Sequence, residues 1–194
     1  SENTVKQISL CKGLEDIPFG TDIFIQDEND SSIKISAELC EDLWVPFSPS
    51  TRHALNGATI IANLSASNEV AGKAEYRRIL VTGHSAKTVS AYIYANASHD
   101  ESSTDMIFSG HSIIAANGAI KAESGLFENT QEFLIADIDL EKLTQDRIKS
   151  TTFSRSTSFA KSEYKTIFVS GLQQEHFADN IDEQLLVKNG FIVR

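Results

Sequence analysis

Short apolar runs separated by polar turns fill the first hundred residues of the chain and predict strands. The runs cover residues 23–25, 33–39, 59–64 and 91–95. Polar residues 27–32 separate the first two, which predicts a pair of strands joined by a turn. The run at 59–64 is apolar on both faces, which is typical of a strand buried in a parallel sheet.

Two segments between these runs have helical patterns. Ser48 is followed by proline and by helix formers as far as Leu55, which predicts a short capped helix that Gly57 would end. Residues 72–90 predict a longer helix, because small or apolar side chains recur there at intervals of three or four. Its expected inward positions are Tyr76, Leu80, Gly83, Ala86 and Ser90, and its expected solvated positions are Lys73, Arg77, Arg78 and Lys87.

Alternation of these strands and helices favours an α/β fold with parallel strands. The segment 41–58 is long enough for a crossover, which needs a dozen or more residues. Parallel strands place their carboxyl ends on one edge of a sheet, where open α/β folds build their sites. We therefore expect Cys40, Ser67 and residues 100–103 along one edge.

After about residue 104 the pattern changes to antiparallel hairpins. Short strands are expected at 106–108, 113–115 and 119–120, with the turn of the last pair at Asn117–Gly118. A further strand is expected at 132–138 and a short helix at 140–148. The serine- and threonine-rich stretch 149–162 is interpreted as a loop.

The composition and charge of the chain limit the classes of partner that it can bind. The 194 residues carry 17 Lys and Arg against 27 Asp and Glu, and this acidic charge would repel a nucleic-acid backbone. No apolar run approaches a membrane span, and the polar start lacks a signal-peptide pattern. We expect a cytoplasmic protein that binds neither nucleic acid nor membrane.

Cys40 is the candidate for chemistry, because it ends an expected strand at the functional edge. Cys11 lies near the start of the chain, where no cluster of polar residues indicates a reactive site, and it is interpreted as an inert free thiol. Glu41 and Asp42 beside Cys40 disfavour its thiolate, so a nearby cation or base is needed. The five histidines form no evident pair with it, and we expect no metal site and no phosphate-binding loop.

Four segments give the chain a specific resemblance. The stretch Ala37-Glu38-Leu39-Cys40-Glu41-Asp42-Leu43-Trp44-Val45-Pro46 is similar to the nucleophile motif in the glutaminase portion of glutamine-dependent NAD synthetases. Residues 63–67 with 72–78 resemble the next block of that family, and residues 101–105 with 108–112 resemble the following one. The resemblance covers about residues 17–127.

The resemblance implies a carbon-nitrogen hydrolase of the nitrilase-like α-β-β-α sandwich type. Such a domain attacks the side-chain amide of glutamine through a thioester and passes ammonia to a synthetase domain. It implies Cys40 as the nucleophile and an oxyanion contact from the backbone amide of Glu41. Ser67 and Lys73 match positions that hold the amino-acid end of glutamine, and we expect Lys73 in the first turn of its helix, facing Cys40.

The sequence also departs from the family pattern. The family's Glu base and its Lys lie in motifs upstream of the cysteine, and neither motif occurs before Cys40. We therefore interpret residues 1–194 as one partial glutaminase domain without its synthetase domain, and we expect negligible glutamine hydrolysis. ATP and deamido-NAD would bind only the absent domain, and a homo-oligomer is expected.

Two alternatives stay open. The chain could act on a different small amide as another nitrilase-type amidase. It could also be a non-catalytic scaffold or oligomerisation piece.

Overall fold

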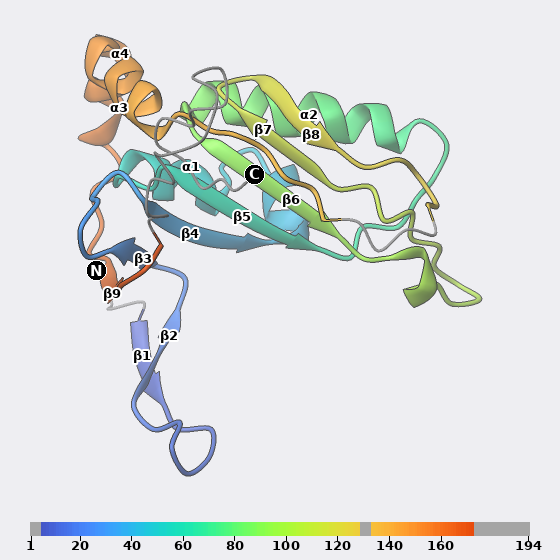
Figure 1. Ribbon diagram of the computed structural model, residues 1–194, viewed down its shortest axis with the longest axis horizontal. Coiled ribbons are helices and arrows are strands. Elements are labelled where there is room, and N and C mark those ends of the chain that lie inside the picture. Colours follow the sequence, from blue (N-terminus) through green and yellow to red (C-terminus); the bar gives the residue numbers. More distant parts are fainter. Residues whose placement is uncertain (1–4, 129–132, 173–194) are drawn as a thin grey trace, which may run out of the picture.

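Seven strands form one mixed sheet in the computed structural model, which describes residues 5–128 and 133–172 (Figure 1). Their order across the sheet is β8-β7-β6-β5-β4-β3-β9. The strands are β3 Ile23–Asp27, β4 Lys34–Leu39, β5 Ile60–Ser65, β6 Ala91–Asn96, β7 Ile113–Ala116, β8 Ala119–Glu123 and β9 Lys165–Val169.

The centre of this sheet is parallel, as predicted. β4 pairs with β5 and β5 with β6 in parallel register, so the strands that contain Ile35, Ile61 and Ile93 are neighbours. β3 lies antiparallel to β4, which confirms the predicted strand pair. The carboxyl ends of β4, β5 and β6 therefore meet at one edge of the sheet.

The strands after residue 104 are antiparallel to the centre but belong to the same sheet. β7 pairs with β6 and β8 with β7, and their turn has positive φ at Asn117 (46°) and Gly118 (86°). Two successive positive φ angles define a type I′ turn, which asparagine followed by glycine favours. A Cβ at Gly118 would lie 2.9 Å from the Cβ of Ala86, so glycine also permits close packing of this turn.

Helices α1 and α2 cover one face of the sheet, and α3 covers only one end of the other face (Figure 1). The helical elements are η1 Cys40–Trp44, α1 Pro49–Leu55, α2 Lys73–Thr88, η2 His99–Glu101, α3 Leu140–Lys149 and α4 Thr151–Thr157. None of the helices within the described residues has the length and apolar character to cross a bilayer.

The inward face of α2 differs from the expectation. The buried residues are Arg77, Val81, Ser85 and Thr88. Tyr76, expected inside, is 51% exposed, and Arg77, expected in solvent, is fully buried. The helix is rotated because Arg77 has a buried ionic partner in Glu69, so its charge does not require water.

Several expectations for the second half were wrong. Residues 149–162 are not one loop, because α4 lies within them and Ser150 caps it with a hydrogen bond from the Phe153 amide at 3.2 Å. Residues 106–108 form no strand; Phe108 makes a single bridge to Asn68. Residues 133–138 are not a strand either, and position 132 lies outside the described residues.

β9 was also not predicted, and it pairs in parallel with β3. The partner strand lies more than a hundred residues earlier in the chain, and no turn or crossover motif in the sequence predicts such a pairing.

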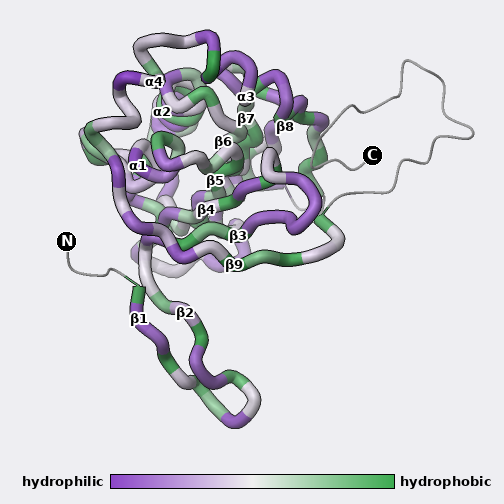
Figure 2. The backbone as a smooth tube through the Cα atoms, turned by 90° about the vertical axis from the view of Figure 1, so that its left-hand side faces the viewer, coloured by the Kyte–Doolittle hydropathy of each residue, from purple (hydrophilic) through white to green (hydrophobic). Residues whose placement is uncertain are grey.

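A two-stranded hairpin projects from the body of the molecule (Figures 1 and 2). It consists of β1 Val5–Ile8 and β2 Ile17–Gly20 in antiparallel register. Exposed apolar side chains lie along it, including Leu10 and Phe19, and the free thiol of Cys11 is exposed in its connecting loop. Sequence patterning did not indicate this hairpin.

Candidate active site

Cys40 follows β4 directly and begins the 3₁₀ helix η1. Its φ of 42° is in the left-handed region, which non-glycine residues seldom adopt and which costs backbone energy. The side chain is partly buried and the thiol is free. A sharp turn at the end of a buried strand is a geometry that presents a nucleophile to substrate.

The two acidic residues after Cys40 have different surroundings. The Asp42 carboxylate accepts a hydrogen bond from the Leu39 amide at 2.8 Å, so it folds back over the end of β4. Glu41 is exposed, and its amide lies in the first turn of η1. Amides of a first helical turn have no intrahelical acceptor. The Glu41 N–H is therefore a donor that a substrate oxygen can use.

Lys73 is the first residue of α2, as predicted, and its ammonium turns toward the Cys40 segment. Its Nζ donates to Asn68 Oδ1 at 2.6 Å and lies 5.3 Å from the centre of the Trp44 ring. Burial lowers the pKa of Lys73, and so does Arg77, while the charges of Glu69 and Cys40 act to raise it. The ammonium thus lies over the last residue of η1, the 3₁₀ helix that Cys40 begins.

Ser67 is buried at the end of β5 and is fixed through its backbone. Its amide donates to Asn96 Oδ1 at 2.9 Å, and Asn96 Nδ2 donates to the Ser67 carbonyl at 3.3 Å. Asn96 ends β6, so the contact joins the ends of two neighbouring strands. No role for Asn96 was predicted from the sequence.

A buried ionic network supports the loop of Ser67 and Asn68 and the start of α2, where Lys73 lies. Both terminal nitrogens of Arg77 donate to Glu69 Oε2 at 3.1 Å, and the Ser109 hydroxyl donates to the same oxygen at 2.6 Å. Arg77 also contacts His111 Nδ1 at 2.7 Å. These bonds connect the start of α2 with the segment before β7.

The protonation of His111 follows from its partners. A guanidinium can only donate, so Nδ1 accepts from Arg77 and the proton is on Nε2, which donates to Glu123 Oε1 at 2.6 Å. Burial lowers the pKa of His111, consistent with a neutral ring. This histidine is structural, as its lack of an evident cysteine partner suggested.

A second polar cluster lies under the Cys40 turn. The Glu38 carboxylate accepts from the Tyr92 hydroxyl, from the Ser50 amide at 2.9 Å and from Asn63 Nδ2 at 3.4 Å. His84 Nε2 lies 2.7 Å from the Ser50 hydroxyl at the edge of this cluster. Sequence reasoning missed Glu38 and Asn63, and the available signal was a polar residue on the inward face near the end of each strand.

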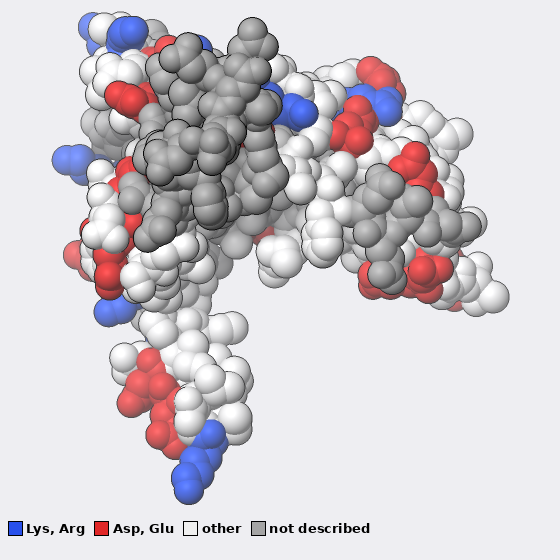
Figure 3. All heavy atoms as spheres, viewed as in Figure 1, with Lys and Arg blue, Asp and Glu red and all other residues white. Residues whose placement is uncertain are grey.

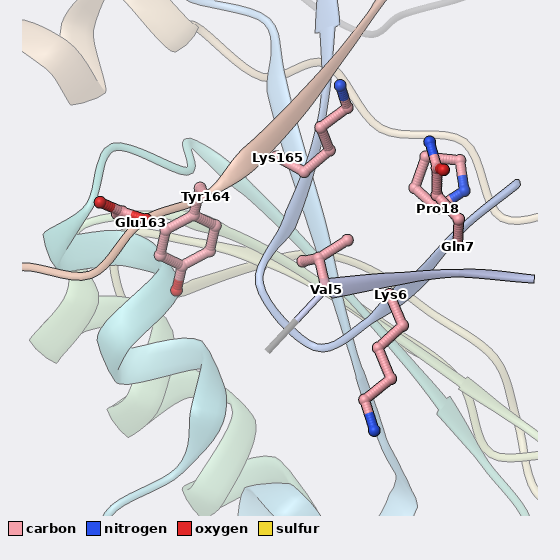
Figure 4. Close-up of a pocket in the computed structure, with 7 residues that line it drawn as sticks. All are labelled: Val5, Lys6, Gln7, Pro18, Glu163, Tyr164 and Lys165. Carbon is pink, nitrogen blue, oxygen red and sulfur yellow. The ribbon is translucent and has the colours of Figure 1, made fainter. Parts of the chain in front are cut away.

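No hydrogen bond reaches the Cys40 sulfur from any residue in the ranges 5–128 and 133–172. A pocket of about 490 Å³ lies elsewhere, at the base of the hairpin beside the start of β9 (Figure 4). It is lined by Val5, Lys6, Gln7, Pro18, Glu163, Tyr164 and Lys165, so the candidate site residues do not contribute to it. Among the described residues no group of three or more His, Cys, Asp or Glu is arranged to hold a metal ion.

Figure 3 shows acidic side chains at the end of the molecule where η2 lies, and also at the opposite end and on the projecting hairpin. Asp100 and Glu101 of η2 are exposed there. The loop 100–103 follows β6 at the same edge as Cys40, as predicted.

The chain is similar in sequence to known proteins. The chain is 41% identical over 141 residues to the glutamine-dependent NAD(+) synthetase of Mycobacterium tuberculosis, covering 73% of this chain and 21% of that protein. It is 32% identical over 147 residues to the human protein of the same name, covering 75% and 20%. The chain thus spans about a fifth of the length of these curated relatives.

Solved structures share the fold. A glutamine-dependent NAD(+) synthetase from Cytophaga hutchinsonii matches with a TM-score of 0.55 and 29% identity, over 70% of this chain and 20% of that one. A carbon-nitrogen hydrolase from Helicobacter pylori matches with a TM-score of 0.53 and 25% identity, over 64% and 46%. The carbon-nitrogen hydrolase profile matches residues 8–148, and the chain belongs to the carbon-nitrogen hydrolase family.

Proposed function

We propose that this chain is the glutamine-hydrolysing part of a glutamine-dependent NAD synthetase and that Cys40 is its nucleophile. The observation that carries the proposal is the left-handed turn of Cys40 at the carboxyl edge of the sheet, with the Lys73 ammonium facing the same segment. Relatives named as such synthetases, at 41% identity, support the choice of glutamine over other amides.

The proposed reaction has two steps. The Cys40 sulfur attacks the carbonyl carbon of the glutamine side-chain amide, the thiol proton passes to the amide nitrogen, the C–N bond breaks, and ammonia leaves. The resulting thioester is then hydrolysed by water, which gives glutamate and the free thiol. During each step the carbonyl oxygen becomes an oxyanion, to which the Glu41 N–H donates.

Recognition of glutamine falls to Lys73 and Ser67. The Lys73 ammonium pairs with the α-carboxylate of the substrate, and its place in the first turn of α2 adds the favourable end of the helix dipole. The buried Ser67, locked by Asn96, orients the same end of the molecule. The Trp44 ring, beneath the Lys73 ammonium, forms a wall of this subsite.

Activation of the sulfur needs further groups. The family supplies a Glu base and a second Lys from motifs that have no counterpart before Cys40 in this sequence, and Lys73 is engaged by Asn68. Members of a catalytic set act as a unit, so losing some costs nearly as much as losing all. The 194-residue chain alone therefore hydrolyses glutamine negligibly.

The wider context is also part of the proposal. The ammonia passes to a synthetase domain of a longer protein, where ATP and deamido-NAD bind, and the assembly is a homo-oligomer.

The test is covalent labelling with an electrophilic diazoketone analogue of glutamine, followed by peptide mass spectrometry. Labelling should fall on Cys40, disappear in Cys40→Ala and be slowed by free L-glutamine. In Lys73→Met the protection by L-glutamine should weaken about tenfold, because a charge-assisted contact contributes roughly 1.5–3 kcal/mol. Cys11→Ala removes the exposed thiol of the hairpin as a background.

Other results of the labelling experiment would favour a general amidase or a non-catalytic scaffold. Equal protection by acetamide and L-glutamine would indicate a general amidase. Labelling of Cys40 that L-glutamine does not slow at any concentration would indicate a scaffold. Rapid glutamine hydrolysis by the 194-residue chain that is lost in Cys40→Ala would contradict the activation argument.

A further inference from the structure

A buried carboxylate lies beneath the nucleophile turn without a cationic partner. Glu38 is 3% exposed, and no ion pair among the described residues includes it. Its oxygens accept from the Tyr92 hydroxyl, the Ser50 amide and Asn63. Burying an anion that has only neutral donors is costly, and an apolar residue of similar size is often more stable. Stability alone therefore does not explain why a glutamate occupies position 38.

Asn63 connects this carboxylate to the nucleophile. It is fully buried on β5, where its Nδ2 donates to the Tyr92 hydroxyl at 3.0 Å and lies 3.4 Å from both Glu38 Oε1 and the carbonyl oxygen of Cys40. Its Oδ1 accepts from the Ser65 hydroxyl at 2.7 Å. A flipped amide would set its oxygen against the Glu38 carboxylate, so the anion fixes which end of the amide faces Cys40.

The planarity of the peptide bond carries this orientation to the reaction site. In a trans peptide the C=O and the following N–H point in opposite directions, and the described chain contains no cis bond. The Cys40 carbonyl points inward to the buried Asn63. The Glu41 N–H of the same peptide therefore points away from Asn63, toward the open side of the turn.

We propose that Glu38 and Asn63 are positioning residues. Glu38 orients the Asn63 amide, and Asn63 holds the Cys40–Glu41 peptide so that its N–H is aimed at the oxyanion formed when the Cys40 sulfur attacks a carbonyl carbon. The inference rests on the proposed function for the role of Cys40. Neither side chain touches the substrate, and both act through the backbone of the turn.

Two reactions of Cys40 separate this role from a merely structural one. Iodoacetamide alkylates the sulfur by displacing iodide, and no oxyanion forms. p-Nitrophenyl acetate acylates the sulfur through a tetrahedral oxyanion and expels p-nitrophenolate. The ratio of the acylation rate to the alkylation rate at Cys40, measured by mass spectrometry in a Cys11→Ala background, reports the oxyanion contact.

Asn63→Ala should lower this ratio about tenfold while alkylation stays within about twofold, since the loss of one oxyanion donor costs roughly 10² to 10³ and a misaimed donor costs less. Glu38→Gln, which keeps the volume, should lower the ratio in the same direction by a smaller factor. The matched control is Ser36→Ala on the same strand. It removes a partly buried hydrogen bond of 3.0 Å to the Ile23 carbonyl without touching the turn, and its ratio should not change.

An unchanged ratio in both Asn63→Ala and Glu38→Gln would overturn the inference, as would an equal slowing of both reactions. If Asn63→Ala does not fold, Glu38→Gln decides alone. Neither reagent contains the amino-acid end of glutamine. A lowered ratio without glutamine protection would therefore reject the proposed substrate and keep the positioning role, whereas the opposite result would reject only the role.

Discussion

The two faces of the central sheet are built in opposite ways. The face under α1 and α2 buries a continuous cluster that includes Phe24, Ile61 and Tyr92. On the opposite face a second cluster, with Ile60 and Leu140, covers only the amino ends of the parallel strands. At their carboxyl ends Leu39 is 64% exposed and Leu64 58%.

Buried polar chemistry lies on the helix-covered face. Glu38, Asn63, His53 and Arg77 are all inside it, and each makes hydrogen bonds or an ion pair. The exposed end of the other face is aliphatic. A packed layer can hold polar groups in fixed positions, because their partners cannot exchange for water. The covered face therefore orients the turn of Cys40 and the start of α2 from behind.

The largest expected effect is on the ionic network of the covered face. Arg77→Met removes the cation from Glu69, whose side chain is only 9% exposed, and should reduce the free energy of unfolding by about 3–5 kcal/mol. Urea denaturation would measure it. The control is Lys142→Met, which breaks the exposed pair with Asp146 and should leave the stability unchanged within error. A loss below about 1 kcal/mol would contradict the assignment of Arg77 to a buried network.

The apolar core of the same face should show the next effect. Ile61 is fully buried between the sheet and the helices, and Ile61→Ala should cost about 2–4 kcal/mol through lost burial and a cavity. The urea midpoint should fall without a change in its slope. A cost near zero would show that this face is not closed in solution.

Sequence patterning predicted the parallel centre well, because it depends on local signals. The runs around Ile35, Ile61 and Ile93 and the helical spacing between them were sufficient to order β4, β5 and β6. The turn at Asn117–Gly118 was found for the same reason. Cys40, Ser67 and Lys73 could be placed on one edge because each follows or faces the end of one of these strands.

Features that depend on distant partners were missed. The predicted buried face of α2 was wrong because an arginine on a helix is expected to face solvent. The partners that allow Arg77 to be buried, Glu69 and His111, are evident only in the folded structure. α4 has a loop-like composition, and the Phe153 ring lies against the buried Arg147 guanidinium at 5.1 Å, a contact that no local pattern indicates. Asn63 could not be linked to Cys40 because the two residues are 23 positions apart and meet only when β4 pairs with β5.

Acid should weaken the covered face. Burial lowers the pKa of His53, His84 and His111 below the usual value of about 6.5. As the pH falls below this value the unfolded chain binds protons that the folded chain does not, so the free energy of unfolding decreases. The decrease is at most about 1.4 kcal/mol per histidine for each pH unit and ends once the pH is below the folded pKa values.

Urea denaturation at pH 7.5, 6.5 and 5.5 would measure this decline. His84→Gln should make it shallower, because one of the three rings with a lowered pKa is gone. The control is His99→Gln, at a partly exposed ring, which should preserve the decline. Stability that rises from pH 7.5 to 5.5 would mean that the rings are protonated in the folded protein.

The smallest effect is expected on the other face of the same strand. Leu64 is three positions after Ile61 on β5 but is 58% exposed, so truncation removes little apolar area that folding had taken from water. Leu64→Ala should therefore change the free energy of unfolding by about 0.5 kcal/mol or less, the range of ordinary surface substitutions. Ile61→Ala and Leu64→Ala are on the same strand and both introduce alanine. The difference between their effects on the free energy of unfolding therefore reports the two faces of the sheet rather than the strand propensity of alanine. A cost for Leu64→Ala that approaches that of Ile61→Ala, and that grows with protein concentration, would show that a second copy of the chain covers this face in solution, because association stabilises only the folded form.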